Sequence, residues 1–545
     1  MNPDFSKNPA APMLVPETVA PNLSGNRLKL PGTVLLLLFL TAAIALSWSH
    51  HKLMSQDEFF ALQTDSVSTV SQLVHIQRTS PISLDPLVYH LLAHAAMRVF
   101  GVGAFALRLP AFLGYLLMQV CLYFIVRRIA GERAGIFAVA FPAITATLFY
   151  SAEGRPYGLL LGLYALTLLA WQSASRRSLS NAESAGLRWR TWGTLALLAA
   201  SIALTLNAHY FGILLLIPLC AAELFRTLER RRIDIPVVIA IFVGMAGIIF
   251  ALPFQKPAAE FRQHYYNGGT VSLHAVTQAY RALFIDYTHF SLRTQHVIAA
   301  LFVVLTLVFG LICLRALRGR TLAIPAAELA FIVVLAALPF FGFLLARFFT
   351  HSIEVRYVLG AIIGITVLLA VVIAPRLRDD GAYLLTLLTL FAAILVTGIV
   401  RIRTETRSTD EVRASLVLTP ELKAAILASP SQLLYIQDMG HFEVASYYEP
   451  DLFVRSHVAL LYSREEELQY DKHDTVSLTA MHMRAFTGFP IVAYEQWKQQ
   501  PGPHILILFH SGWDWTDQAL AEDHAELSPL GPALGGDAVS VRFHR

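Results

Sequence analysis

The sequence is poor in charged residues. Only 15% of its 545 residues are Asp, Glu, Lys or Arg, whereas 55% are hydrophobic. Soluble domains carry about 25% charged residues, so a chain of this length folded as several soluble domains is excluded. Lipid must cover a large part of the protein.

Cysteine is also scarce, and its placement excludes the usual roles of that residue. Cys121, Cys220 and Cys313 stand far apart inside apolar runs, with no CxxC or Cys/His spacing. This spacing does not suggest zinc; we interpret the three cysteines as packing residues at lipid depth and assign no residue to a metal. The net charge of +4 is small for this length and gives no sign of a nucleic-acid partner.

Long apolar runs, by contrast, are abundant. A membrane-spanning helix needs about 20 mostly apolar residues. Residues 1–30 are polar, a lead that is too long for a cleaved signal peptide, and are predicted to form a cytoplasmic N-terminal tail. Residues 31–400 are predicted to form a membrane domain of about 11 transmembrane helices, at 31–49, 105–126, 134–150, 156–172, 191–207, 210–225, 235–253, 295–316, 323–346, 355–374 and 382–400.

The positions of the basic residues predict the orientation in the membrane. The run at 86–100 is only moderately apolar and contains two histidines and an arginine, so we predict an amphipathic helix that lies on the membrane. With that choice, the arginine-rich loops between spans all fall on one side, which the positive-inside rule assigns to the cytoplasm. The loops 50–104 and 254–294 then lie outside.

After Arg401 the composition becomes that of a soluble domain. Helix-compatible stretches such as 516–526 separate short β-runs at 432–437, 457–462, 490–494, 504–510 and 538–543. We predict that residues 401–545 form a periplasmic α/β domain. The expected fold class is therefore a polytopic α-helical membrane protein with a C-terminal soluble α/β domain.

An acidic pair follows the first predicted span. Asp57 and Glu58 are flanked by Met54, Phe59 and Phe60, which should hold the pair near the lipid. Carboxylates are costly to desolvate at such a boundary, and one of them could act as a general base. The alternative is that both are solvated loop acids beside a helix end.

Two short outer turns contain further candidates. Glu153 and Arg155 precede Pro156 between the third and fourth spans, and His209 lies in the turn Asn207–Gly212. The first pair could be no more than a helix cap and an interface anchor, and His209 an ordinary interfacial histidine. The topology nevertheless places all of them on the same side of the membrane as Asp57.

Arginines on the outer side need a reason, because they run against the positive-inside preference. Arg347 and Arg356 lie near the ends of the ninth and tenth predicted spans, and the 254–294 loop adds Lys256, Arg262, Arg281 and Arg293. Guanidinium groups bind phosphate oxygens in a fork, although ordinary lipid headgroups would satisfy the same arginines. Cations beside a carboxylate suit group transfer from a lipid phosphate.

These motifs occur in the order found in a known class of enzymes. The chain resembles the GT-C membrane glycosyltransferases over residues 31–400, particularly the protein O-mannosyltransferases and the lipid A aminoarabinose transferase. The segments that carry the resemblance are Asp57-Glu58, Asp85-Pro-Leu-Val-Tyr89, Phe105-Ala-Leu-Arg-Leu-Pro110, Ser151-Ala-Glu-Gly-Arg-Pro-Tyr157, His209-Tyr-Phe-Gly212 and Arg356-Tyr357.

The resemblance implies inverting transfer of a sugar from undecaprenyl or dolichyl phosphate, without a nucleotide sugar or another cofactor. By the same resemblance, Asp57 would be the catalytic base, with Glu58 and Glu153 shaping the pocket. With Arg347 from the charge argument, the candidate substrate-binding residues are Asp85, Tyr89, Arg155, Tyr157, His209, Arg347, Arg356 and Tyr357. Many relatives have a cation in the motif before Pro86, where this chain has Leu84-Asp85.

The leading hypothesis is a glycosyltransferase of the bacterial inner membrane whose active site faces the periplasm. Its partners would be the polyprenyl-phosphate sugar, membrane lipid and a periplasmic acceptor, which is a protein, lipid A or an envelope glycan. One alternative is a transporter or flippase of lipid-linked substrates, but such a protein would need charges deep within its spans. In another, the membrane domain is inactive and residues 401–545 are a binding module.

Overall fold

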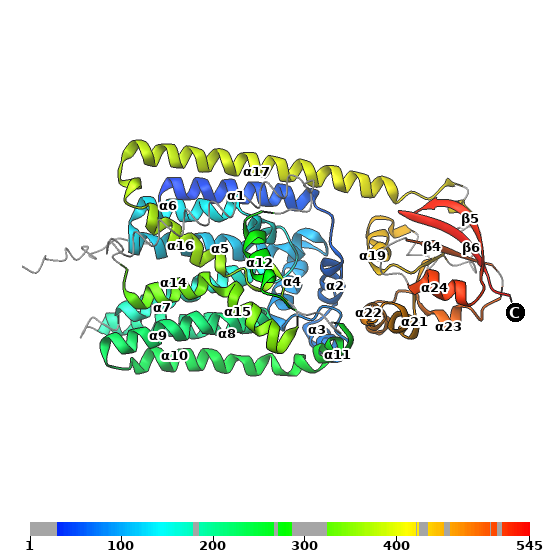
Figure 1. The fold of residues 1–545 in the computed structure, drawn as a ribbon, viewed down its shortest axis with the longest axis horizontal. Helices are drawn as coiled ribbons and strands as arrows, with labels where there is room; N and C mark the ends of the chain where they lie inside the picture. Colours follow the sequence, from blue (N-terminus) through cyan, green and yellow to red (C-terminus); the bar gives the residue numbers. More distant parts are fainter. Residues whose placement is uncertain are drawn as a thin grey trace, which may run out of the picture.

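The computed structural model describes residues 30–177, 185–265, 271–285, 324–351, 353–420, 422–424, 434–451, 458–501, 503–509 and 515–544. A helical bundle and a smaller α/β domain lie end to end, and the long helix α17 joins them (Figure 1). The protein is thus a polytopic helical membrane protein with a C-terminal α/β domain, as predicted.

The bundle is built from helices that run along the long axis of the molecule (Figure 1). They are α1 (Gly32–His51), α5 (Ala104–Ala130), α6 (Glu132–Ala140), α7 (Tyr157–Arg177), α8 (Ala185–Ala208), α9 (Leu216–Arg230), α10 (Ile235–Ala246), α14 (Ala326–Ala336), α15 (Leu338–Leu345), α16 (Ala361–Ile373) and α17 (Asp380–Ser415). Short irregular turns extend several of them: η1 (Phe141–Ile144), η2 (Ala146–Ser151), η3 (Tyr210–Leu215), η4 (Gly247–Phe250), η5 (Leu252–Phe254), η6 (Ala346–Thr350), η7 (Val355–Tyr357) and η8 (Arg376–Arg378).

Within the described residues, seven helical stretches are long and apolar enough to cross a membrane, and a bent pair formed by α14 and α15–η6 would be an eighth. The predicted number of 11 is not confirmed. The span predicted at 295–316 lies outside the described residues, and the one at 355–374 contains α16, which has only 13 residues. The span predicted at 134–150 is divided into α6, η1 and η2.

Prolines account for two of these interruptions. Pro142 lies in the first turn of η1, and Pro339 lies in the first turn of α15, where the helix pair bends by 56°. Proline has no amide hydrogen, and its ring clashes with the carbonyl four residues earlier, so a helix cannot continue unchanged through it. The hydropathy of the sequence alone does not reveal such a break in a helix.

Glycines let α5 and α7 approach closely, which fixes the turn before α7. A Cβ on Gly114 of α5 would collide with the backbone of Leu159, and one on Gly158 of α7 would collide with the carbonyl of Ala111. Small residues at helix contacts are typical of membrane bundles. The turn at 151–156 is thereby held against the N-terminal half of α5.

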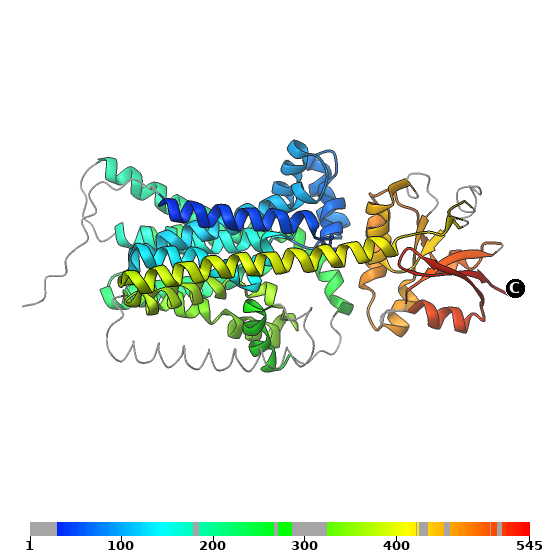
Figure 2. The same ribbon diagram turned by 90° about the horizontal axis from the view of Figure 1, so that it is seen from above.

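Short helices cover the end of the bundle nearest the C-terminal domain (Figure 2). They are α2 (Gln56–Asp65), α3 (Val70–Thr79), α4 (Leu87–Phe100), α11 (Gln255–Tyr265) and α12 (His274–Phe284). The predicted amphipathic helix at 86–100 corresponds to α4, which buries His90 and His94 but exposes Val99 and Phe100. His90 Nδ1 lies 2.7 Å from Asp65 Oδ1 and joins α4 to α2.

The C-terminal domain contains a six-stranded sheet in the order β3-β2-β1-β4-β6-β5. Strands β1 to β4 are parallel to one another, β6 is antiparallel to β4, and β5 is antiparallel to β6. The strands are β1 (Leu434–Ile436), β2 (Val458–Tyr462), β3 (Ile491–Ala493), β4 (His504–Leu508), β5 (Glu526–Ala533) and β6 (Gly536–Arg542). Its helices are α19 (Met439–Tyr448), α21 (Arg464–Tyr470), α22 (Thr475–Arg484), α23 (Tyr494–Trp497) and α24 (Trp515–Glu522).

All five β-runs expected from the sequence contain strands, namely β1 to β4 and β6. Strand β5 was not predicted; it contains Pro529, Gly531 and Pro532 and is largely exposed. Proline and glycine are depleted in strands except at edges and bulges. This strand is at the edge of the sheet and has an irregular register between Pro529 and Gly531.

The helix α17 continues 14 residues past Arg401, to Ser415, and is attached on one face along that length. Arg401 donates to the carbonyl of Thr145 (2.8 Å), and Thr409 donates to the carbonyl of His51 (2.7 Å). The guanidinium of Arg413 lies 5.0 Å from the centre of the Tyr448 ring in α19. Spacings of eight and four residues keep these side chains on one side of the helix, so α17 holds the C-terminal domain against the bundle.

Candidate functional site

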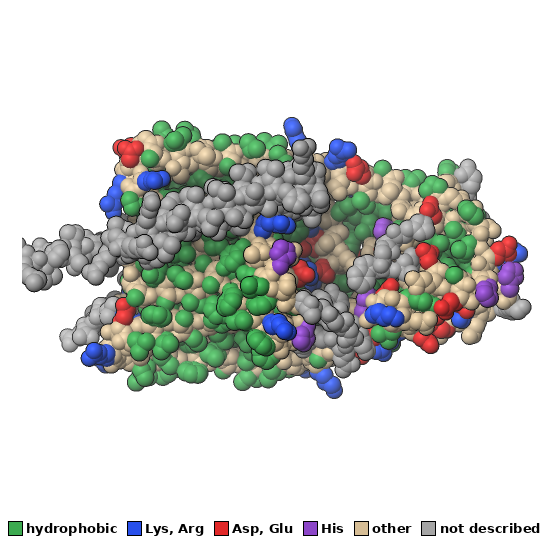
Figure 3. Space-filling view, viewed as in Figure 1, with side chains coloured by type: hydrophobic (Ala, Val, Ile, Leu, Met, Phe, Trp, Pro, Cys, Tyr) green, Lys and Arg blue, Asp and Glu red, His purple; other side chains and the backbone are tan. Residues whose placement is uncertain are grey.

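A cavity of about 400 Å³ lies where the end of the bundle meets the C-terminal domain. Figure 3 shows a recess at this junction in which basic, acidic and histidine side chains gather. Its wall comes from segments that are far apart in the sequence. The lining residues are Asp57, Phe60, Ile82, Ser83, Leu84, Asp85, Arg155, Tyr157, His209, Tyr210, Phe211, Gln255, Phe261, Thr350, Arg356, Tyr357, Thr475 and Thr479.

Asp57 lies between two arginines in this wall. Its Oδ2 atom is 3.2 Å from Nη1 of Arg356 and 3.9 Å from Nε of Arg155. The Asp57 side chain is 38% exposed, whereas that of Arg155 is only 9% exposed. A second carboxylate, Asp85, binds Arg155 from the other side at 2.9 Å. The arrangement presents one accessible carboxylate with two guanidinium groups beside it.

Aromatic rings support the two arginines. Arg356 lies over the rings of Tyr157 and Tyr357, at 6.0 and 5.7 Å from their centres. Tyr357 stacks in parallel on Phe211, with ring centres 4.0 Å apart. Arginine keeps its charge in proteins, so these contacts orient a permanent cation towards the cavity.

His209 is buried and takes part as a neutral group. Its Nδ1 atom accepts a hydrogen bond from the amide of Phe211 (3.1 Å), so the proton of the neutral ring is on Nε2, which lies 3.5 Å from Asp85. Burial lowers the pKa of His209 to about 4; Asp85 opposes this effect, and Arg155 and Arg356 add to it. His209 therefore orients Asp85, which in turn holds Arg155.

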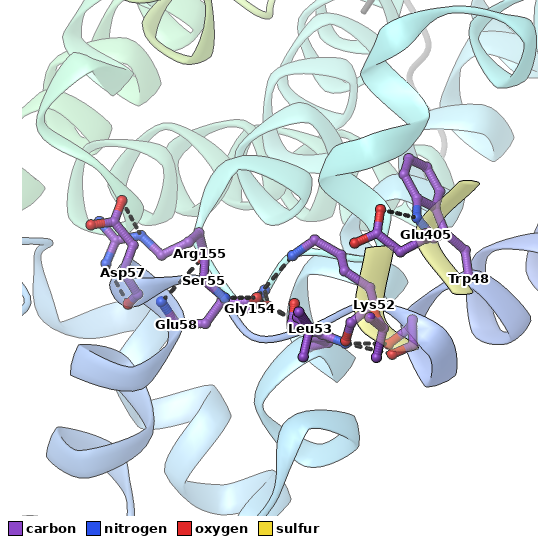
Figure 4. Close-up of polar contacts among 12 residues, drawn as sticks. Trp48, Lys52, Leu53, Ser55, Asp57, Glu58, Gly154, Arg155 and Glu405 are labelled. Carbon is purple, nitrogen blue, oxygen red and sulfur yellow. Dashed lines mark hydrogen bonds and ion pairs between the residues drawn. The ribbon is translucent and has the colours of Figure 1, made fainter. Parts of the chain in front are cut away.

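Glu58 is fully buried behind Asp57, and both of its oxygens are engaged (Figure 4). Oε1 accepts from Arg108 Nε and from the amide of Gly154, both at 2.6 Å. Oε2 accepts from Lys52 Nζ at 2.8 Å and from the amide of Ser55 at 2.9 Å. Burial alone would raise the pKa of Glu58, but the charges of Arg108 and Lys52 outweigh it and hold the pKa well below its usual range.

Arg108 is the centre of this network, and sequence reasoning missed its role. It is 2% exposed, and besides Glu58 it donates to the carbonyls of Ser49 and Leu53. It thereby joins the end of α1, the start of α2 and α5. The available signal was an arginine inside the apolar run that begins α5, two residues before Pro110. The network fixes α2, and with it the position of Asp57.

Glu153 lies beside this network and outside the cavity wall. Its side chain is buried, and burial raises its pKa to about 7; Lys52 and Arg155 oppose the shift, whereas Glu58 and Asp57 add to it. A group with this pKa is only partly ionised at neutral pH. It can therefore gain or lose a proton under conditions in which Glu58 stays charged.

Glu153→Gln is expected to remove a pH dependence of stability. An unfolded glutamate titrates near 4.3, so from about pH 4.5 to 7 the folded protein binds more protons than the unfolded one, and stability falls as pH rises. The variant avoids this loss and should be about 1–3 kcal/mol more stable than wild type at pH 8. Unfolding midpoints in detergent at pH 5 and pH 8 provide the comparison, and an identical pH dependence in both proteins would contradict the assignment.

The remaining candidates lie away from the cavity. Tyr89 is fully buried and donates to the carbonyl of Leu107 at 2.7 Å. Arg347 is exposed on η6 and does not line the wall. The structure thus brings Asp57 together with Asp85, Arg155, Tyr157, His209, Arg356 and Tyr357, and leaves Glu58, Glu153, Tyr89 and Arg347 outside the lining. Among the described residues, no cluster of three or more His, Cys, Asp or Glu is placed to hold a metal ion.

Comparison with known proteins agrees with this architecture. Residues 85–254 match the family model for dolichyl-phosphate-mannose-protein mannosyltransferases. The crystal structure of ArnT from Cupriavidus metallidurans in the apo state has a TM-score of 0.61 at 12% identity, covering 94% of this chain and 98% of that one. The protein has the GT-C glycosyltransferase fold.

A structure of the same ArnT bound to undecaprenyl phosphate gives a TM-score of 0.60 at 13% identity, with 93% of this chain and 98% of that one covered. No curated protein sequence is significantly similar to the chain. The family model and the two ArnT structures confirm the resemblance inferred from the sequence motifs, and the shared fold covers both the bundle and the C-terminal domain.

Proposed function

We propose that the protein transfers a sugar from a polyprenyl-phosphate donor to a hydroxyl group of an acceptor. The observation that carries the proposal is the position of Asp57, an accessible carboxylate beside Arg155 and Arg356 in a cavity of a GT-C fold. Such a site combines a proton acceptor with cations that stabilise a leaving phosphate.

The two arginines would exchange partners when the donor binds. A phosphate competes with the Asp57 carboxylate for the guanidinium of Arg356, 3.2 Å away. Charge-assisted, forked hydrogen bonds to phosphate are strong, so donor binding would release Asp57 to accept a proton.

The chemical step then balances as a direct displacement. Asp57 accepts the proton of the acceptor hydroxyl, and the acceptor oxygen forms a bond to the anomeric carbon of the sugar. The bond from that carbon to the phosphate oxygen breaks, and its electron pair stays on the phosphate, where Arg155 and Arg356 stabilise the added charge. Attack opposite the leaving phosphate inverts the anomeric configuration.

The other candidate residues would act by positioning Asp57, Arg155 and Arg356. Because Glu58 is saturated by Arg108, Lys52 and two amides, we assign it the role of positioning α2 rather than contact with substrate. Asp85 would hold Arg155 in place, with His209 behind it. Sugar transfer of this kind needs no cofactor besides the lipid-linked donor.

The proposed setting is the bacterial inner membrane, with the N-terminus in the cytoplasm and the site facing the periplasm. Undecaprenyl phosphate is the proposed carrier, since an ArnT of the same fold is bound to it in a solved structure. The acceptor would be a periplasmic protein, lipid A or an envelope glycan.

Reconstitution tests this function against the flippase alternative. The purified protein in liposomes is incubated with undecaprenyl-phosphate-linked sugars and an envelope extract, and sugar-bearing products are sought by mass spectrometry. A glycosyltransferase releases undecaprenyl phosphate and forms a new glycoside, whereas a flippase moves the intact donor across the bilayer. Transbilayer movement of donor without any glycoside would refute the proposal.

Arg356→Lys should weaken binding of undecaprenyl phosphate about 10-fold to 100-fold. Lysine keeps the charge but loses the fork that binds two phosphate oxygens and the planar surface that lies over Tyr157 and Tyr357. Titration of the detergent-purified protein with the lipid measures the change. Arg98→Lys is the matched control, because Arg98 is exposed on α4 outside the cavity. Equal affinities of the two variants would argue against a phosphate site at Arg356.

A further inference from the structure

One wall of the cavity belongs to the C-terminal domain. Thr475 and Thr479 lie on α22, yet they line the same cavity as Asp57 and Arg356. The sequence motifs of the membrane domain give no reason to expect this contribution. The C-terminal domain therefore completes the site and is not merely attached beside it.

The face of α22 that meets the cavity is anchored to the bundle end. His482, seven residues after Thr475, places Nδ1 2.8 Å from the carbonyl of Pro81, and its ring packs edge-on against Phe261 of α11 at 5.3 Å. Positions 475, 479 and 482 share one helix face. Ile82, next to Pro81, is buried in the hydrophobic core of the C-terminal domain. The two threonines are thus held at fixed positions in the wall.

The chemistry of this wall differs from that of the arginine side. The Oγ1 atom of Thr475 is buried and has no hydrogen-bond partner among the described residues. The hydroxyl of Thr479 donates to the carbonyl of Thr475 at 2.8 Å, which leaves its lone pairs available to accept. An unsatisfied buried hydroxyl destabilises the protein, so a ligand that supplies hydroxyl groups would bind here favourably. Phe60 and Phe261 add aromatic rings to the uncharged part of the lining.

We propose that Thr475 and Thr479 form the subsite for the transferred sugar, and that α22 helps to select which sugar is accepted. The inference rests on the proposed function. If the phosphate is bound by Arg155 and Arg356, the group directly attached to it occupies the remaining cavity, which extends to α22. Neutral hydroxyls and ring faces recognise a polyhydroxylated ring, whereas a second phosphate would require cations that α22 does not place in the lining.

Binding measurements with and without the sugar test this subsite. Wild type, Thr475→Val and the double variant with Thr479→Val are titrated with sugar-free undecaprenyl phosphate and with undecaprenyl phosphate carrying glucose, mannose, galactose or arabinose. Each lost hydroxyl is expected to reduce the gain in affinity due to the preferred sugar about 3-fold to 10-fold. Affinity for the sugar-free lipid should not change.

Thr487→Val is the matched control. Thr487 follows α22, and its hydroxyl donates to the carbonyl of Met483 and accepts from the amide of Phe489. It lies outside the cavity lining, so this variant should bind every lipid as wild type does.

Three outcomes would overturn the subsite. In the first, both variants keep the sugar-dependent gain in affinity. In the second, their affinity for the sugar-free lipid falls equally. In the third, the wild-type protein binds no sugar-bearing lipid more tightly than undecaprenyl phosphate. A fourth, an increased KM for the acceptor with unchanged donor affinity, would assign the threonines to the acceptor instead. Sugar-selective binding by a wild-type protein that forms no glycoside would refute the proposed function but retain the subsite.

Discussion

Asp57→Asn should reduce sugar transfer about a hundredfold to ten-thousandfold while the protein remains folded. This is the range that a general base contributes to an enzymatic step, and asparagine cannot accept the proton of the acceptor hydroxyl. The substitution also removes the negative charge that competes for Arg356 and Arg155. Undecaprenyl phosphate should therefore bind the variant at least as tightly as wild type.

The two readouts together separate a catalytic role from a structural one. Transfer rates are measured in liposomes at saturating donor, and donor affinity is measured by titration of the same preparation. Asp410→Asn, at an exposed position of α17, is the control and should retain full activity. Loss of both donor binding and transfer in Asp57→Asn would mean that Asp57 organises the arginines rather than accepting the proton.

Glu58→Gln should destabilise the protein by about 3–5 kcal/mol, the usual cost when one member of a buried ion pair is removed. The glutamine would leave the charges of Arg108 and Lys52 uncompensated in a site where Glu58 is fully buried and Arg108 is 2% exposed. The amides of Ser55 and Gly154 would also lose a charged acceptor. Unfolding of the purified protein in detergent, followed by tryptophan fluorescence, measures the loss.

An exposed glutamate provides the comparison. Glu411 pairs with Arg407 at 2.9 Å on α17, and both side chains are more than 60% exposed. Because water screens such pairs, Glu411→Gln should cost at most about 1 kcal/mol. If the two substitutions lower stability equally, the buried network does not hold α2 in the way that its geometry suggests.

Most of the charged residues that line the cavity could be predicted from the sequence. Asp57, Arg155, His209 and Arg356 each follow or precede an apolar run, and the alternation of spans places all four at one end of the bundle. Topology alone therefore brought them together, although nearly 300 residues separate Asp57 from Arg356.

The contacts between side chains at that end of the molecule could not be predicted from the sequence. Nothing in the local pattern shows that Arg108 reaches Glu58, 50 residues earlier, because their approach depends on how α5 packs against the end of α1. Thr475 is an ordinary helix residue in the sequence, and it becomes part of the cavity only through the docking of α22. Hydropathy likewise detected the apolar run at 134–150 but not its division at Pro142.

The 36-residue length of α17 has a consequence for how this protein can diverge. Each residue inserted into a helix turns everything beyond it by about 100° and shifts it by about 1.5 Å. A single insertion would swing α22 away from the arginines, and even a two-turn insertion that restores the angle would lift it out of reach. Exposed loops tolerate insertions, but we expect selection to remove them between Asp380 and Ser415. The length of this helix is therefore constrained more tightly than the identity of its residues.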